Sequence, residues 1–258
     1  MKEVSLFTSR LIAFVVLLVA GLWGQTNCDE GNGAMDSAPP NNMSVQDVIQ
    51  RFGAAESAAK EARTHYTYKQ DVLMQTLAGK NVNGEFREVT TVSYDAKGRR
   101  QELVTFAAQP SLRGIQLTEE DMQDIREFMP LMLTTEDIPR YNLTYDGQQH
   151  VDDLDTYVFH LTPKKDDKGA RYFEGRIWVE ARDFQIVKVC GKSGPERLHV
   201  KKHEHQQLDP MFVTYRQQVD EHWLPAYTRS DETLQFPSRP VHVREIIKYT
   251  GYKRTEGR

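Results

Sequence analysis

The sequence predicts a mainly β protein of the α+β class, in which a curled antiparallel sheet forms an incomplete β-barrel with a few helices packed on its concave face. From residue 66 onward, side chains alternate between apolar and polar over most of the chain, which is typical of strands. Turn residues separate about nine or ten such segments at the spacing expected of a curled antiparallel sheet. Several segments carry large apolar residues on both faces, so one face could pack on helices while the other faces the interior of the curled sheet.

The first helix is expected over residues 44–63. Ser44 is suited to the N-cap position, with Asp47 three residues later, and Met43 can pack against Val48. Apolar residues then recur at helical spacing at Val45, Val48, Ile49 and Phe52. These residues form one apolar face that would pack on the sheet.

Three antiparallel strands should follow this helix. The alternation begins at Tyr66, and Asn83-Gly84 has the composition of a tight hairpin turn. A second turn is expected at residues 95–98, "DAKG", before the strand "RRQELVTFA". The pattern therefore indicates a meander of three strands.

A second helix should begin at Thr118, with Asp121 completing its N-terminal cap, and Pro130 should end or kink it. The segment at its end is rich in flexible apolar residues: Phe128, Met129, Leu131, Met132 and Leu133. Such a segment is either ordinary core or a movable lid over an apolar cavity. Because methionine is unbranched and polarizable, it suits a lid that must adapt to what it covers.

Beyond residue 140 nearly every segment reads as strand. Asp146-Gly147 and Asp220-Glu221 have turn composition, and residues 173–191 form a clear hairpin pattern. In that hairpin Ile177 and Trp178 must point to opposite faces, because successive strand residues do so.

The N-terminus predicts export. Residues 11–24 are apolar, but fourteen residues are fewer than the ~20 that a membrane-spanning helix needs. Together with the preceding basic residues, this favours a cleaved signal peptide over residues 1–24, the alternative being an uncleaved anchor. Residues 25–43 have the composition of a flexible linker, and residues 44–258 are expected to form a single domain.

The chain has two cysteines, Cys28 and Cys190. Cys28 follows the apolar run, but Asn27 is not the small residue that lipid modification would require before it. In an exported chain the two cysteines could form one disulfide. Three states of Cys28 therefore remain open: lipidated, paired with Cys190, or free.

The composition and motifs do not indicate catalysis or nucleic-acid binding. The net charge is −4 and the basic residues are scattered, so no cationic surface for nucleic acid is expected. No glycine-rich phosphate loop or nucleophile elbow occurs, and no cofactor is expected. His199, His203 and His205 could share one strand face, but they lack a defined fourth ligand, so we expect a solvated loop and no metal.

The order of elements and two soft motifs resemble a known family. The motifs are "FEGRIWVEARDFQIVKVCGKSG" and "VDEHWLPAYTRSDETL", the second with a V-D-x-x-W-L-P turn leading into a long strand. Over residues 44–252 this layout resembles the outer-membrane lipoprotein-sorting family of LolA and LolB type.

The resemblance implies a non-enzymatic periplasmic carrier whose half-barrel binds the acyl chains of lipoproteins. It also implies an inner-membrane releasing complex and an outer-membrane receptor as partners. The apolar cavity would be lined by residues such as Tyr68, Val92 and Trp178. An arginine that holds the lid shut matches Arg87 by position, with Arg99 and Arg100 as alternatives. A periplasmic sensor or scaffold of the same fold, binding a protein partner or another lipid, is the other function that the sequence leaves open.

Overall fold

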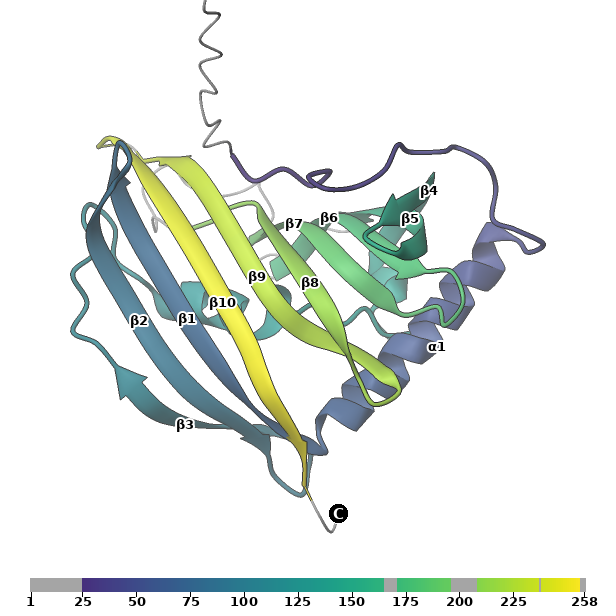
Figure 1. The fold of residues 1–258 in the computed structure, drawn as a ribbon, viewed down its shortest axis with the longest axis horizontal. Helices are drawn as coiled ribbons and strands as arrows, with labels where there is room; N and C mark the ends of the chain where they lie inside the picture. The colour runs from purple at the N-terminus through teal and green to yellow at the C-terminus, as the bar shows by residue number, and fades with distance from the viewer. Residues whose placement is uncertain (1–24, 165–170, 196–207, 237, 256–258) are drawn as a thin grey trace, which may run out of the picture.

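The computed structural model describes residues 25–164, 171–195, 208–236 and 238–255. Its centre is one antiparallel sheet of ten strands, which curls without closing (Figure 1). The strands are β1 (Tyr66–Ala78), β2 (Asn81–Tyr94), β3 (Arg100–Ala107), β4 (Tyr141–Val151), β5 (Leu154–Pro163), β6 (Arg171–Glu180), β7 (Ile186–Pro195), β8 (Phe212–Val219), β9 (His222–Gln235) and β10 (Pro240–Arg254). The mainly β fold class and the open, curled sheet are confirmed.

The strand order explains where the helices must lie. The order is β3-β2-β1-β10-β9-β8-β7-β6-β5-β4, so β3 and β4 are consecutive in sequence but form opposite edges of the sheet. The connection between them, residues 108–140, therefore has to cross from one edge to the other. It carries the short helices α2 (Glu119–Gln123), η1 (Asp124–Phe128) and η2 (Ile138–Arg140).

The helix α1 (Val45–Arg63) forms as the sequence predicts. Ser44 accepts a hydrogen bond from the backbone N–H of Asp47, and the Asp47 carboxylate accepts one from the N–H of Ser44, which completes the capping box. Phe52 is fully buried, and its ring lies 5.5 Å from that of Phe159 on β5. These contacts place the apolar side of α1 on the inner face of the sheet.

The two faces of the sheet carry separate apolar clusters. The inner cluster contains Phe52 of α1, Val92 of β2, Met129 of the connection and Phe159 of β5. The outer cluster contains Val158, Trp178, Val187 and Val213. Residues adjacent in one strand thus serve different cores, as Ile177 and Trp178 do on β6.

Two predicted turns are wrong, and in each case a glycine serves close packing instead. The first hairpin turns between Ala78 and Asn81, so Gly84 lies inside β2, where an added Cβ would come within 2.4 Å of the Ser111 carbonyl oxygen. Likewise Gly147 lies inside β4 at an irregularity in strand register. The turns expected at residues 95–98 and at Asp220-Glu221 are confirmed.

The segment expected to be a flexible linker, residues 25–43, makes specific contacts from Thr26 to Pro39. It crosses the outer face of the sheet to the edge strand β4 and then leads to α1 (purple in Figure 1). Asn32 and Asp36 form bridges with Val151 and Gln148 of the edge strand β4. The polar composition of this segment reflects its exposure, since it is held by backbone and side-chain hydrogen bonds without a core of its own.

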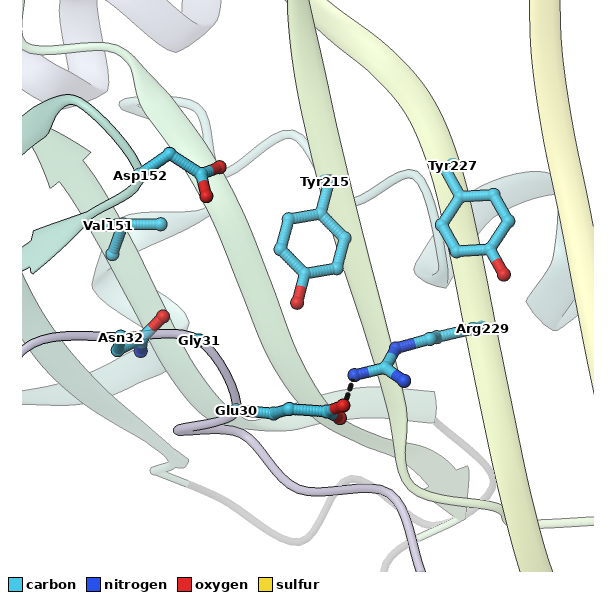
Figure 2. Close-up of a pocket in the computed structure, with 8 residues that line it drawn as sticks. All are labelled: Glu30, Gly31, Asn32, Val151, Asp152, Tyr215, Tyr227 and Arg229. Atoms are coloured by element: carbon cyan, nitrogen blue, oxygen red, sulfur yellow. Dashed lines mark hydrogen bonds and ion pairs between the residues drawn. The ribbon is translucent and has the colours of Figure 1, made fainter. Parts of the chain in front are cut away.

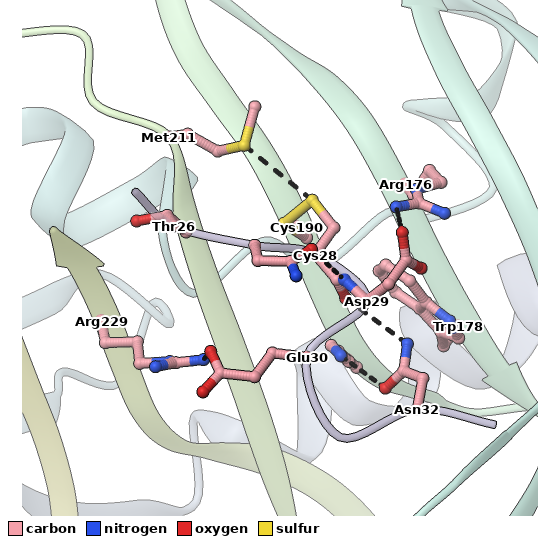
Figure 3. Close-up of a disulfide and its surroundings, with 12 residues drawn as sticks. Thr26, Cys28, Asp29, Glu30, Asn32, Arg176, Trp178, Cys190, Met211 and Arg229 are labelled. Atoms are coloured by element: carbon pink, nitrogen blue, oxygen red, sulfur yellow. Dashed lines mark hydrogen bonds and ion pairs between the residues drawn. A yellow bond between two sulfur atoms is a disulfide. The ribbon is translucent and has the colours of Figure 1, made fainter. Parts of the chain in front are cut away.

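A disulfide fixes the same segment to the sheet. Cys28 is bonded to Cys190 of β7, with the two Cα atoms 5.5 Å apart (Figure 3). Of the three states left open by the sequence, the structure has the paired one. This bond joins positions 162 residues apart and closes the N-terminal segment onto the outer face.

Candidate functional site

The candidate site is the inner face of the sheet together with the segment that crosses it. We call residues 119–140 the lid. Thr118 and Asp121 form a capping box at its start, as predicted, but the α-helical part is only five residues long. It continues as the π-helical turn η1, and Pro130 follows directly after Met129. A π-turn and a proline both interrupt the regular hydrogen-bond ladder, so the lid is a weakly self-supported segment.

Side chains of the sheet bind the backbone carbonyls that this irregular lid leaves without helical partners. Pro130 has no N–H to donate, and the carbonyl oxygen of Ile125 instead accepts a hydrogen bond from the Gln70 amide at 3.3 Å. The carbonyl of Met129 accepts one from the Thr214 hydroxyl at 2.7 Å. A third bond runs from the Arg216 guanidinium to the carbonyl of Leu131. Three side chains from two strands, β1 and β8, therefore hold the lid by its backbone.

Arg216 also joins the lid to α1. Its guanidinium forms a two-pronged ion pair with the Glu56 carboxylate at 2.7 and 3.0 Å, and the side chains are 1% and 0% exposed. Sequence reasoning missed both residues, although a signal existed. Glu56 lies between Phe52 and Ala59 on the apolar side of the helix, and Arg216 shares the phase of the buried Thr214.

The five predicted lid residues lie between the sheet and α1. Met129, Leu131 and Leu133 belong to the inner cluster together with Tyr68 and Val92, and Phe128 packs against it from the side. Met132 contacts a smaller cluster with Ala59, Tyr66 and Leu224. Met129, Leu131 and Leu133 thus share one buried cluster with the predicted cavity residues Tyr68 and Val92.

Trp178 does not lie with these residues. It is on the outer face of β6, where its indole N–H donates to the Gln149 side chain at 2.6 Å. Its assignment to the inner cavity is corrected, because the strand period places Ile177 inward and Trp178 outward.

The predicted latch residue, Arg87, does not touch the lid. It pairs with Asp71 of the neighbouring strand at 2.9 Å and remains 45% exposed. Arg99 pairs with Asp95 in the turn at 2.7 Å. Arg100, the other alternative, donates to the Gln70 amide oxygen at 2.6 Å, and so reaches the lid through the amide that binds Ile125.

A groove of about 500 Å³ opens beside the lid. It is bounded by Phe86 and Glu88 of β2, the loop before α2, and Met122 and Arg126 of the lid. Most of its lining is apolar, including Leu112, Ile115 and Leu117. Met122, which lines this groove, also packs against the inner cluster.

A buried acid lies under the lid. Glu245 on β10 is 1% exposed, and neither carboxyl oxygen has a hydrogen-bond partner among the described residues. Burial, followed by the carboxylates of Asp121 and Asp124 on the lid, raises the pKa of Glu245 to about 8. At neutral pH this acid is therefore mainly protonated, and the lid can lie over it without charge repulsion.

The outer face carries a second pocket, of about 430 Å³ (Figure 2). Tyr215 and Tyr227, cross-strand neighbours on β8 and β9, line one side. Asp152 from the β4–β5 turn lies opposite, and Glu30 paired with Arg229 closes the pocket from the N-terminal segment. This pocket is separated from the lid by the sheet itself.

Among the described residues, no group of three or more His, Cys, Asp or Glu side chains is placed to hold a metal ion. The histidines 199, 203 and 205 lie outside the described residues, as does the predicted signal peptide over 1–24. Within the described ranges, no helix is both long and apolar enough to cross a membrane.

No protein-family model and no curated protein matches the chain. Among solved structures it is similar to a LolA superfamily protein from Nitrosomonas europaea, with 14% identity and a TM-score of 0.37, covering 84% of this chain and 96% of that one. A DUF1329 family protein from Desulfovibrio piger has 16% identity and a TM-score of 0.39, with 80% and 95% covered. An outer membrane lipoprotein-sorting protein domain from Vibrio parahaemolyticus has 9% identity and a TM-score of 0.36, with 82% and 94% covered.

Two of these three proteins carry the name of the family that the sequence resembles. At such identities and TM-scores the likeness does not identify a ligand or a partner.

Proposed function

We propose that the protein is a non-enzymatic periplasmic carrier that binds lipoprotein acyl chains beneath the lid and sorts lipoproteins toward the outer membrane. The observation that carries this proposal is the attachment of the lid. It crosses the concave face, presents Met129, Leu131 and Met132 inward, and is bound to the sheet through three side-chain donors. Such a lid can lift without breaking any strand pairing.

The free energy of holding the lid closed and the free energy of burying an acyl chain are of similar size. Each of the three bonds to lid carbonyls contributes about 1 kcal/mol, somewhat more for the charged Arg216. An acyl chain that buries ten CH₂ groups gains about 8 kcal/mol before the lid is displaced. The apolar lid side chains lose part of their own burial on opening, so the two terms are comparable and binding is reversible. A carrier needs this balance.

Export rests on the predicted signal peptide, and the disulfide supports it. Bonds such as Cys28–Cys190 persist in oxidising compartments, of which the bacterial periplasm is one. The partners of such a carrier would be an inner-membrane complex that releases lipoproteins and an outer-membrane receptor that accepts them. No cofactor is required for binding or release.

Two experiments test the carrier function. Mass spectrometry of the protein purified from its native host should find copurifying acyl lipids, and fatty acids should displace a hydrophobic dye from the purified protein. Absence of both lipid and dye binding would contradict the proposal.

Variants locate the binding site. The double variant Met129→Ser with Met132→Ser should weaken dye binding and also lower stability. The loss in binding free energy should be larger than the loss in unfolding free energy. Met211→Ser is the matched control, because Met211 packs with the outer cluster, away from the lid. If the lid variant loses more stability than affinity, these methionines are ordinary core.

The edge strand β3 favours a second candidate function, a sensor or scaffold that binds a protein partner. Its residues Leu103, Val104 and Phe106 are 66%, 50% and 49% exposed. An exposed apolar edge strand can pair with a strand of another chain. For this function a stable complex should survive removal of lipid, and Leu103→Lys should disrupt it while Met129→Ser does not.

A further inference from the structure

The N-terminal segment crosses the outer face of the sheet. We call residues 26–36 the strap. Three consecutive strap residues each contact a different strand: Cys28 is bonded to Cys190 of β7, Asp29 pairs with Arg176 of β6 at 2.7 Å, and Glu30 pairs with Arg229 of β9 (Figure 3). Arg176, Cys190, Val213 and Arg229 form one row of cross-strand neighbours. The strap therefore presents its acids in register with the cations of the sheet.

The surface beneath the strap combines cations with aromatic rings. The ammonium group of Lys188 lies 4.8 Å from the Trp178 ring centre and 5.2 Å from that of Tyr215. It donates to the side-chain oxygen of Asn32 in the strap at 2.7 Å. Burial lowers the pKa of Lys188 to about 8, so this cation depends on polar partners that the strap supplies. Arg176 also lies over Trp178, at 5.1 Å.

The strap occupies this surface through polar contacts and one covalent bond. Asp29, Glu30 and Gly31 are exposed, and so is most of the chain up to residue 37. The Asp29 carboxylate has a lowered pKa, caused mainly by its hydrogen bond to Arg176, which shows that the surface favours an anion at this position. Exposed ion pairs are individually weak, so without the disulfide another acidic segment could compete for the same positions.

We propose that the outer face under the strap is a binding surface for an extended acidic peptide, that the strap occupies it in cis, and that the Cys28–Cys190 disulfide decides whether a peptide from a partner can replace the strap. The open pocket beside it, lined by Tyr215 and Tyr227, continues the surface beyond the strap. This site lies on the opposite side of the sheet from the lid and does not depend on lipid binding.

Opening the strap requires a dithiol reductant. Its thiolate attacks the sulfur of Cys28, which is half-buried, and Cys190 leaves as a thiolate that takes up a proton. The second thiol of the reductant then attacks the mixed disulfide and releases Cys28 as a thiol. The reductant ends as a disulfide, and the protein carries two thiols.

The test is a binding measurement with a labelled peptide of residues 26–36 in which Ser replaces Cys28. The receiving protein is the full chain with Cys28→Ser and Cys190→Ser, and with Asp29→Asn and Glu30→Gln to weaken the strap as a competitor. Fluorescence anisotropy at low salt should show binding at least about tenfold tighter than for a peptide with Asn and Gln at positions 29 and 30, because two charge-assisted bonds are lost in that control. Binding should weaken as salt is added.

Adding Arg176→Gln and Arg229→Gln to the same protein should abolish the preference for the acidic peptide. The disulfide-bonded wild type should not bind the peptide, and wild type treated with dithiothreitol should bind it, which tests the proposal even if the multiple variant does not fold. Equal binding of both peptides, binding that survives loss of the two arginines, or no difference between oxidised and reduced wild type would each overturn the proposal.

Discussion

Replacing Arg216 with Met should destabilise the protein strongly, because it leaves the Glu56 carboxylate buried without its cation. In the native structure both side chains are fully enclosed, and Glu56 also accepts the backbone N–H of Ile186 at 3.2 Å. Removing one member of a buried ion pair costs about 3–5 kcal/mol. Glu56→Met should cost a similar amount, since Arg216 is then the uncompensated charge.

The double variant Arg216→Met with Glu56→Met distinguishes the effect of an unpaired buried charge from the effect of losing the hydrogen bond to the lid. Two apolar side chains replace the pair, so no charge remains buried, but the carbonyl of Leu131 and the N–H of Ile186 lose their partners. Each such loss costs about 1–3 kcal/mol. We expect the double variant to be no less stable than either single variant, which corresponds to a coupling energy of about 3–5 kcal/mol.

Urea unfolding followed by circular dichroism measures these free energies, and amide hydrogen exchange over residues 129–133 reports the lid. Exchange there should rise in the double variant, because Leu131 has lost its donor. Strictly additive losses, or a single variant that loses less than about 1 kcal/mol, would refute the assignment of a buried, coupled pair.

Three further changes have expected outcomes. Between pH 4.5 and 8 the unfolded chain loses the proton of Glu245 while the folded chain keeps it. The unfolding free energy should therefore fall with rising pH, by up to about 1.4 kcal/mol per pH unit, and level off above pH 8. In urea titrations the variant Glu245→Gln should not show this fall. Gly147→Val should cost about 1–3 kcal/mol in unfolding free energy and raise hydrogen exchange near Asp36, because an added Cβ would lie 2.2 Å from the Asp36 carbonyl oxygen; unchanged exchange would contradict that contact. Cys28→Ser with Cys190→Ser should lower the unfolding free energy by about 2–5 kcal/mol, because the bond no longer restricts the unfolded chain. An unchanged unfolding free energy would mean that the disulfide fixes the strap without stabilising the fold.

The sequence was sufficient for features that depend on local patterns. The cap at Ser44, the cap at Thr118 and the turn at Asp220 all follow from residue types at fixed spacing, and each forms as expected. The opposite placement of Ile177 and Trp178 also follows from strand period alone.

Features that depend on contacts distant in sequence were not predictable in this way. Gly84 and Gly147 have the composition of turns, but they are glycines because another backbone segment passes close to them. Position suggested Arg87 for the contact with the lid, whereas it is Arg216 on β8 that donates to the lid carbonyl of Leu131.

The strap shows the same limit. Its polar sequence resembles a linker, and nothing local shows that Asp29 and Glu30 meet arginines on strands β6 and β9.

The path of the lid from one sheet edge to the other has a mechanical consequence. Because residues 108–140 are anchored to β3 at one end and to β4 at the other, the lid cannot leave the molecule when it opens. Any ligand that pushes the two edge strands apart also pulls on both ends of the lid, and any force that shortens the lid draws the edges together. The distance between the two edge strands and the stretching of the lid therefore change together. A bulky ligand would thus shift β3, the edge strand with exposed apolar residues.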